Sequence, residues 1–298
     1  MLHTILTFGA VLGLLLMCLG ILSARIILEL SGTPESVMSQ ALLYIRIYFL
    51  SIPFMVIYNF GSAILRSFGD SRRPDEFQFR FRDMKIEKNA LKKVLAIGIP
   101  AGIQGAIFSV SNVFIQSGIN SFGENAIAGS SLALNFEYFT YDIASAFAQT
   151  AVTFTSQNYG AGNVKRCKKV FWLCLLFGFG FTEILAIVFM IWDDFFVSIY
   201  TTSSAVAVYG LIRMHHVCSL EGPTATYEVE SSALRGMGKS LEPSIITILG
   251  TVVFRLIWMV TVFKWIPTYD MLMNVYLASW IFTGGAIFIV YWHHMKKV

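Results

Sequence analysis

The chain has 298 residues, of which 56% are hydrophobic and only 13% are charged, and its net charge is +4. Soluble domains carry about 25% charged residues, so this composition excludes an ordinary soluble domain and indicates a chain that lies mostly in lipid. A closed barrel would need alternating segments of about ten residues, which the sequence lacks. We therefore expect an all-α polytopic membrane protein.

Eight apolar runs are long enough to cross a bilayer, which takes about 20 helical residues. Because every backbone N–H and C=O in lipid must be paired within its own segment, we expect each run to be a helix. The runs lie at roughly 5–29, 40–65, 94–119, 125–155, 169–192, 203–234, 244–263 and 271–292. The first is expected to be a retained helix, because no Lys or Arg precedes it and no small-residue cleavage site follows it.

Basic residues gather on one side of the predicted spans. Nine lie in residues 66–93, four in 165–169, two in 235–239 and two in the tail, which makes 17 of the 22 Lys and Arg. The positive-inside rule then places both termini in the cytoplasm. Residues 72–93 also contain four acidic residues, which favours a cytoplasmic linker over a surface that binds nucleic acid or lipid headgroups.

Two apolar runs end in the same way. The stretch "YNFGSAILRSFGDSRRP" occupies residues 58–74, and "YEVESSALRGMGKSLEP" occupies residues 227–243. Seven residues of the first recur in the second at a constant offset of 169: Tyr58, Ser62, Leu65, Arg66, Gly69, Ser71 and Pro74 recur as Tyr227, Ser231, Leu234, Arg235, Gly238, Ser240 and Pro243. The repetition indicates that the chain contains two related halves.

Polar residues follow helical spacing in the third and fourth runs. The third has Gln104, Asn112, Gln116 and Asn120. The fourth has a stripe of Ser131, Asn135, Tyr138, Asp142, Ser145, Gln149, Thr153 and Ser156, with Glu137 beside it and Tyr141 one turn later. Polar side chains in lipid are costly and usually face a bundle interior or a water-filled cavity. Amides and hydroxyls also tie helices together, so for them both interpretations stay open.

The sixth run carries Glu221, Glu228 and Glu230 around Pro223. A proline removes a helical hydrogen bond and kinks the helix, and such breaks are common near membrane binding sites. Arginines in the apolar runs are expected to be salt-bridge partners or to reach toward the membrane surface, rather than to contact substrate. They are Arg46, Arg213 and Arg255.

Metal binding and enzymatic chemistry find little support. The stretch "HHVCSLE" at 215–221 groups two histidines, Cys218 and Glu221, but matches no established ligand spacing. The sequence has no G-x-S-x-G, no phosphate-binding loop and no catalytic triad pattern. We therefore expect neither a metal site nor an enzyme.

The stretches "GIPAGIQGAIFSVSNVFIQSGINSFGENAIAGSS" (98–131) and "QNYGAGNVKRCKK" (157–169), with the two L-R-x-x-G-x-S-x-x-P endings, resemble the multidrug and toxic compound extrusion (MATE) family. The resemblance implies twelve helices in two six-helix lobes, with the two endings closing the fourth helix of each lobe. On this basis residues 1–70 resemble two helices of the N-terminal lobe, 71–93 form a basic cytoplasmic linker, and 94–298 resemble the six-helix C-terminal lobe.

The resemblance also implies a function. We expect secondary-active efflux of small organic, cationic compounds across the plasma membrane by alternating access, with H⁺ or Na⁺ as the coupling ion and no cofactor. The residues expected to bind cation or substrate are Glu137, Asp142, Glu221, Gln104, Asn112, Tyr138 and Tyr141. Glu137 matches a commonly acidic position of the family and Glu221 is a looser match. The alternatives are a lipid-linked oligosaccharide flippase of the same superfamily and a membrane bundle without transport of its own.

Four family helices, the first, second, fifth and sixth, have no counterpart in this interpretation. Surfaces that those helices would cover should then lack a partner in the chain, and we expect Gly9, Gly13 and Gly20 to lie on such a surface. Exposed packing surface favours association. The partners expected are therefore membrane lipid and either a second copy of the chain or a complementing chain, with no nucleic acid.

Overall fold

The computed structural model describes residues 2–30, 35–67 and 86–297. All regular elements in these residues are helical, which confirms the predicted all-α class. The chain divides into two compact units, unit 1 (Met1–Ala96) and unit 2 (Ile97–Val298), whose boundary lies within helix α3 (Lys88–Asn120). The predicted division at residues 70 and 93 stays a prediction, because most of the linker lies outside the described residues.

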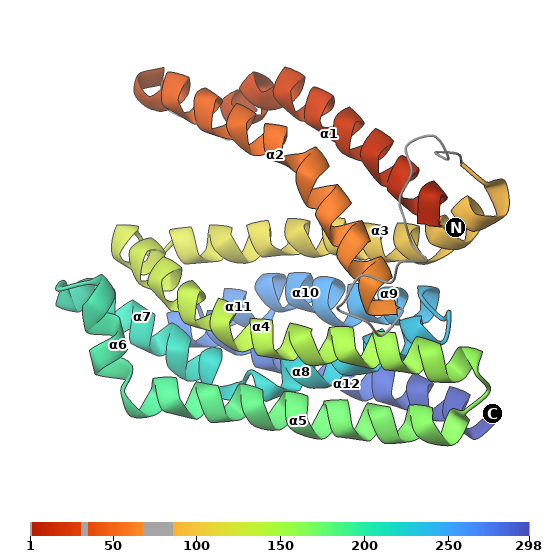
Figure 1. Cartoon of the computed structure of the whole chain (residues 1–298). Coiled ribbons are helices and arrows are strands. Elements are labelled where there is room, and N and C mark those ends of the chain that lie inside the picture. Colours follow the sequence, from red (N-terminus) through yellow and green to blue (C-terminus); the bar gives the residue numbers. More distant parts are fainter. Residues whose placement is uncertain (1, 31–34, 68–85, 298) are drawn as a thin grey trace. The chain divides into compact units, whose positions relative to one another are not determined.

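Unit 1 consists mainly of two long helices that pack against each other (Figure 1). Helix α1 covers Leu2–Leu30 and α2 covers Glu35–Ser67. Helix α2 contains Pro53, and Figure 1 shows α2 changing direction part-way along, as the loss of one hydrogen bond at a proline explains. The backbone N–H of Glu87 donates to Thr4 Oγ1 at 3.2 Å and so joins residue 87 to α1.

Three glycines allow α1 and α2 to approach closely. A Cβ at Gly13 would lie 2.8 Å from the Cα of Pro53, and Cβ atoms at Gly9 and Gly20 would collide with aromatic rings of α2. The glycines therefore pack within the chain, and the expectation that they await an absent helix is wrong. Small residues let two helices approach in lipid, and here that approach joins α1 to α2.

Unit 2 contains the rest of α3 and a bundle arranged around α8. Helix α8 packs against the consecutive helices α4 and α5 and against α12, which lies at the C-terminal end of the chain (Figure 1). The elements are α4 (Glu124–Gly160), α5 (Val164–Ile191), α6 (Asp193–Tyr200), α7 (Ser204–His216), the 3₁₀ turn η2 (Cys218–Leu220), α8 (Gly222–Gly236), α9 (Leu241–Thr247), the π-helical segment η3 (Ile248–Val253), α10 (Phe254–Val260), α11 (Val262–Trp265) and α12 (Tyr269–Lys297).

Six helical segments of the described chain are long and apolar enough to cross a membrane. They are His3–Glu29, Met38–Ile64, Lys88–Asn120, Val164–Ile191, Leu241–Trp265 and Tyr269–Lys296. The other two predicted spans differ in kind. Residues 125–155 lie in the 37-residue helix α4, whose polar stripe lowers its hydropathy, and residues 203–234 form α7, η2 and α8 rather than one helix. The polytopic helical class is confirmed, but the sixth run is interrupted.

The repeated helix ending has a structural explanation in its second copy. The N–H of Lys239 donates to the carbonyl of Leu234 and that of Gly238 to the carbonyl of Arg235, both at 2.9 Å. With Gly238 at φ +80°, this is a Schellman motif, which needs a residue in the left-handed region and therefore favours glycine. The first copy, around Gly69, lies outside the described residues.

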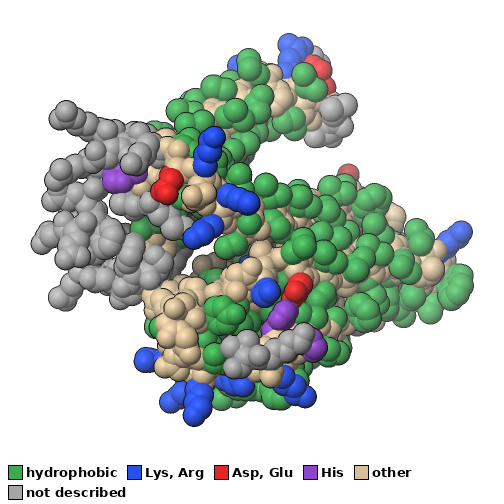
Figure 2. Space-filling model, turned by 90° about the vertical axis from the view of Figure 1, so that its right-hand side faces the viewer, with side chains coloured by type: hydrophobic (Ala, Val, Ile, Leu, Met, Phe, Trp, Pro, Cys, Tyr) green, Lys and Arg blue, Asp and Glu red, His purple; other side chains and the backbone are tan. Residues whose placement is uncertain are grey.

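A group of basic residues lies at one end of unit 2. The α4–α5 turn and the C-terminal end of α12 lie at one end of this unit, whereas α6 lies at the other (Figure 1). The α4–α5 turn and the start of α5 carry Lys165, Arg166, Lys168 and Lys169. Figure 2 shows groups of Lys and Arg side chains beside broad areas of hydrophobic side chains. This arrangement agrees with the predicted sidedness, and the orientation itself stays a prediction.

Candidate functional site

The sixth run is interrupted at η2, and α8 begins directly after Glu221. Pro223 lies in the first turn of α8, where its missing N–H costs nothing, so it starts a new helix after η2. The N–H of Gly222 donates to Glu183 Oε1 of α5 at 2.8 Å. A Cβ at Gly222 would lie 2.5 Å from that same oxygen, so only glycine permits the approach. The Glu183 carboxylate thereby caps the N-terminus of α8, the helix that begins directly after Glu221.

Glu137 of α4 forms a buried ion pair with Arg213 of α7. Arg213 donates from Nε to Glu137 Oε1 and from Nη2 to Glu137 Oε2, the latter at 2.8 Å. Its Nη1 donates to Ser130 Oγ at 2.6 Å. Arg213 is 2% exposed and Glu137 is 9% exposed. All three guanidinium nitrogens are therefore used, and the prediction that Arg213 serves as a salt-bridge partner is confirmed.

Glu221 has a weaker set of partners than Glu137. Its Oε2 accepts from Thr140 Oγ1 at 3.1 Å, and the same hydroxyl lies 2.9 Å from the main-chain carbonyl of Glu137. Glu221 is buried but forms no ion pair within the described part of the chain. Thr140 thus lies between the Glu221 carboxylate and the main chain of α4 at Glu137. The Glu137 carboxylate is neutralised by an arginine, whereas that of Glu221 is held by a single hydroxyl.

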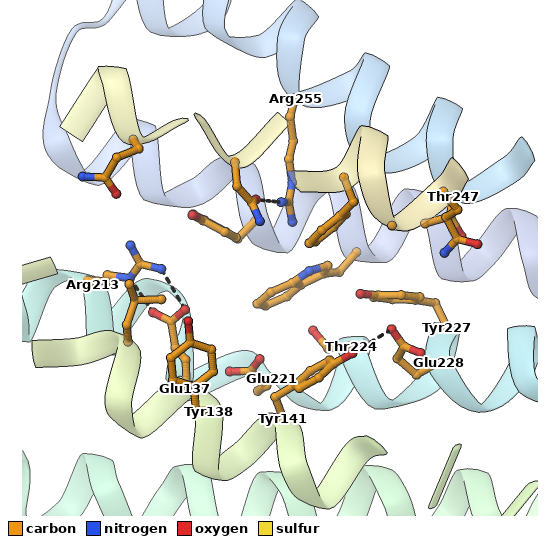
Figure 3. A pocket seen from close by; sticks show the side chains of 18 residues that line it. Glu137, Tyr138, Tyr141, Arg213, Glu221, Thr224, Tyr227, Glu228, Thr247 and Arg255 are labelled. Atoms are coloured by element: carbon orange, nitrogen blue, oxygen red, sulfur yellow. Dashed lines mark hydrogen bonds and ion pairs between the residues drawn. The ribbon is translucent and has the colours of Figure 1, made fainter. Parts of the chain in front are cut away.

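These groups line a cavity of about 500 Å³ inside unit 2 (Figure 3). Its walls come from α3, α4, α7, α8, α9, α10 and α12, so residues more than 170 positions apart meet there. The lining consists of Gln104, Gly105, Phe108, Asn112, Gln116, Leu134, Glu137, Tyr138, Tyr141, Arg213, Glu221, Thr224, Tyr227, Glu228, Thr247, Arg255, Tyr276 and Trp280. A few charged groups among aromatic side chains are typical of small-molecule sites.

Six of the seven predicted site residues line this cavity. They are Gln104, Asn112, Glu137, Tyr138, Tyr141 and Glu221. Tyr141 donates to Glu228 Oε1 at 3.4 Å, and Gln104 Oε1 accepts from Arg235 Nη2 at 2.7 Å. Their roles in binding remain predictions, because the structure contains no ligand.

Asp142 is the exception, because its side chain is exposed and lies outside the cavity lining. Five residues along an α-helix correspond to a rotation of roughly 140°, so Asp142 and Glu137 lie on different sides of α4. The face of α4 that is buried in unit 2 consists of Glu137 with mostly small residues, whereas Ser131, Tyr138, Asp142 and Gln149 of the polar stripe are exposed. The structure therefore does not bring Asp142 to the predicted site.

Sequence reasoning missed several residues of the cavity. Tyr227, Tyr276 and Trp280 have no polar signal that distinguishes them from core aromatic residues in an apolar run. Arg255 was expected to form a salt bridge or to reach toward the membrane surface, but it is buried beside the cavity and has no carboxylate partner among the described residues. Glu221, directly before α8, and Glu228 of α8 are seven residues apart, about two helical turns, and this spacing was a signal that both face the same cavity.

The residues of the "HHVCSLE" stretch point to different partners. His215 pairs with Asp193 at 2.8 Å, while His216 lies 2.8 Å from Asn274 Oδ1 and 3.1 Å from Asp270 Oδ1. Cys218 is buried and Glu221 faces the cavity. The histidines thus link α7 to α6 and α12.

An all-helical membrane bundle with carboxylates around an internal cavity has the architecture of a membrane transporter. The MatE family model matches residues 1–74 and 100–261. The chain therefore belongs to the MatE family, whose members are transporters and not enzymes, and the predicted resemblance is confirmed.

Curated relatives include proteins with names that refer to drug resistance. The chain is 23% identical to "Probable multidrug resistance protein YoeA" of Bacillus subtilis, over 82% of this chain and 66% of the relative. It is 27% identical to "Probable multidrug resistance protein YpnP" of the same organism, over 49% of this chain and 44% of the relative. The chain thus spans less than two thirds of the length of these relatives.

Solved structures support the fold. A MOP superfamily transporter from Pyrococcus furiosus, described as having reverse polarity of its binding pocket, aligns with a TM-score of 0.80 at 16% identity, over 99% of this chain and 78% of that chain. A point mutant of the Vibrio cholerae MATE transporter VcmN aligns with a TM-score of 0.78 at 16% identity, over 100% and 80% of the two chains. At this identity the similarity establishes the fold alone.

Proposed function

We propose that the chain carries out secondary-active export of small organic cations in exchange for protons or sodium ions. The observation that carries this proposal is the set of three carboxylates, Glu137, Glu221 and Glu228, around one cavity inside the bundle. Ionisable groups within membrane segments are costly and mark ion and substrate pathways. Membership of the MatE family and the names of the curated relatives support the same function.

The geometry suggests separate roles for the two central carboxylates. Glu137 is neutralised by Arg213, which fixes the positions of both groups. Glu221 carries no such counter-charge, so its carboxylate is available to a proton, a sodium ion or the cationic centre of a substrate. Competition among these cations for Glu221 couples their movements, because binding of one lowers the affinity for another. Alternating access then exposes the cavity to each side of the membrane in turn.

A lipid-linked oligosaccharide flippase remains the second candidate within transport. The presence of Arg213 and Arg255 in the cavity favours it, because a phosphate-bearing substrate would need cationic groups. Three carboxylates face the same space and one arginine is already paired, so the cavity lacks the strongly cationic character that such a substrate requires. Organic cations are therefore the substrates we favour.

A bundle without transport of its own is the candidate from another class. We propose instead that the chain acts together with a second copy or with a complementing chain, because the helices described in unit 1 are the α1–α2 pair and the start of α3. Two lobes related by a repeat normally share one central pathway in such transporters. Active uptake by demonstrably monomeric protein would contradict this assembly proposal while leaving the transport proposal intact.

Replacement of Glu137 tests the transport function in cells. In a strain where the parent chain confers drug resistance, Glu137→Gln should abolish resistance, because the anionic partner of Arg213 is lost from the cavity wall. Glu124→Gln is the matched control, since Glu124 is an exposed carboxylate at the start of the same helix. Unchanged resistance in Glu137→Gln, at equal protein abundance, would remove Glu137 from the mechanism.

The proposed orientation places both termini in the cytoplasm of a plasma-membrane protein. Cysteines at two exposed positions should then react from opposite sides: Ser203→Cys from outside and Asn163→Cys from inside. Cys18→Ser serves as the background, because Cys18 is the exposed cysteine and the other three are buried. Reversed accessibility of a membrane-impermeant maleimide at either position would overturn the orientation.

A further inference from the structure

Arg255 is a buried cation whose charge has no counter-charge in the described chain. It lies on α10, directly after the π-helical segment η3, and is 1% exposed. Its Nε donates to Ser279 Oγ at 3.1 Å and its Nη1 to Asn112 Oδ1 at 3.3 Å. Its guanidinium carbon lies 4.7 Å from the centroid of the Tyr276 ring and 5.3 Å from that of Phe108.

The contrast with Arg213 shows what Arg255 lacks. Arg213 directs two nitrogens at a carboxylate, whereas Arg255 has no carboxylate oxygen within 4.0 Å in the described residues. A guanidinium has five N–H donors, and two of those on Arg255 reach neutral oxygens. Contacts with the two rings stabilise the charge in part. A buried guanidinium that retains free donors and lines a cavity is suited to an anionic group of a ligand, which it can bind through two parallel hydrogen bonds.

The cavity separates its charges. Figure 3 shows Glu137, Glu221 and Glu228 along the side formed by α4 and α8, with Arg255 entering from the opposite side. The lining also contributes the aromatic residues Tyr227, Tyr276 and Trp280. A ligand that satisfies this arrangement has a cationic centre toward α8, an aromatic body, and an acidic group toward α10.

We propose that Arg255 is an anion-binding subsite of the cavity, and that the preferred substrates are aromatic zwitterions rather than simple organic cations. The shared chemistry of the acidic group is a carboxylate or sulfonate, which matches the planar guanidinium. This proposal rests on the proposed function, since it assigns the substrate class of the same cavity, and it names Arg255 as the residue that determines specificity.

A matched pair of dyes tests the subsite directly. Tetramethylrhodamine carries a free carboxylate beside its cationic ring system, and its methyl ester lacks only that negative charge. Binding to the purified full-length chain in detergent is measured by fluorescence anisotropy, with empty micelles as the blank. We expect the acid to bind about tenfold more tightly than the ester, a difference of about 1.4 kcal/mol, because only the acid offers a carboxylate for charge-assisted hydrogen bonds to the guanidinium.

The variants separate charge recognition from general structure. Arg255→Gln should remove the preference, so that the acid and the ester bind with equal affinity, and Arg255→Lys should retain part of the preference because it keeps the charge. Arg166→Gln, which removes an exposed arginine at the start of α5, should keep the full preference.

The possible outcomes test the Arg255 subsite and the proposed function separately. Equal or weaker binding of the acid by the parent chain overturns the Arg255 subsite without any variant, and so does an undiminished preference in Arg255→Gln. The ester reports on the proposed function separately, because it carries the cationic end alone. Ester binding without a preference for the acid leaves the proposed function standing, whereas binding of neither dye contradicts both.

Discussion

Units 1 and 2 use different means to hold helices together. In unit 1, glycines of α1 let the helix approach Phe49, Pro53 and Phe60 of α2, and no charged side chain is buried among the residues described there. Unit 2 buries Glu137, Arg213, Glu221, Glu230 and Arg255. Both units consist of membrane-type helices, so lipid surroundings alone do not require the buried charges.

The difference shows that unit 2, unlike the described part of unit 1, buries charged side chains at a cost in stability. Burying an ion pair in a low-dielectric interior contributes little net stability, and apolar packing of similar volume is often as stable or more so. Unit 1 demonstrates that this sequence can join helices through apolar contacts. All of the buried charges of unit 2 named above except Glu230 line the cavity, which is where we place the transport chemistry and which best explains them.

The largest expected effect comes from breaking the buried pair of unit 2. Arg213→Gln leaves Glu137 buried without its counter-charge, and we expect a loss of about 3–5 kcal/mol in the free energy of unfolding. The Glu137→Gln, Arg213→Gln double variant should recover most of that loss, because it removes both charges. Thermal unfolding of four proteins in detergent, the parent, Glu137→Gln, Arg213→Gln and the double variant, measures the cycle.

The double variant also separates structure from function. If the pair serves only to join α4 and α7, the double variant should be stable and should still confer drug resistance. We expect it instead to be stable and inactive, since the pair forms part of the charged wall of the cavity that also contains Glu221. A stable, fully active double variant would contradict our assignment.

A smaller effect is expected at the close approach in unit 1. Gly13→Ala places a Cβ 2.8 Å from the Cα of Pro53, so the helices must separate, at a cost of about 1–3 kcal/mol. Gly61→Ala is the control on α2, because no described atom lies within 4 Å of the added Cβ, and alanine there should raise helix stability by roughly 0.5–1 kcal/mol. Equal midpoints for the two variants in thermal unfolding would mean that the α1–α2 contact contributes nothing.

Much of the fold follows from the sequence because lipid leaves few alternatives. Long apolar runs had to be helices, and the matching endings at Arg66 and Arg235 predicted a repeat whose second copy is a Schellman motif at Gly238. Glu137 and Gln104 could be assigned to a cavity because a polar side chain in an apolar run has few other places to go.

Other features could not be predicted because they depend on which face of a helix is buried. Asp142 belongs to a convincing polar stripe, yet Asp142 is exposed, and α4 contributes to the cavity through Glu137, Tyr138 and Tyr141 instead. The interruption after α7 depends on the hydrogen bond from Gly222 to Glu183, two residues 39 positions apart, and hydropathy averaged along the sequence does not detect it. Arg255 was assigned a salt bridge because single-sequence patterns do not show which partners are absent.

Ion-driven dye transport by purified protein in liposomes tests the central claim most directly. With an imposed proton or sodium gradient, the parent chain should accumulate a fluorescent organic cation, and collapse of the gradient should stop the accumulation. Glu221→Gln should bind the cation weakly and lose the gradient dependence, because the carboxylate that the cations compete for is gone. Gradient-driven accumulation that is the same in Glu221→Gln as in the parent would contradict the claim that this cavity couples the two movements.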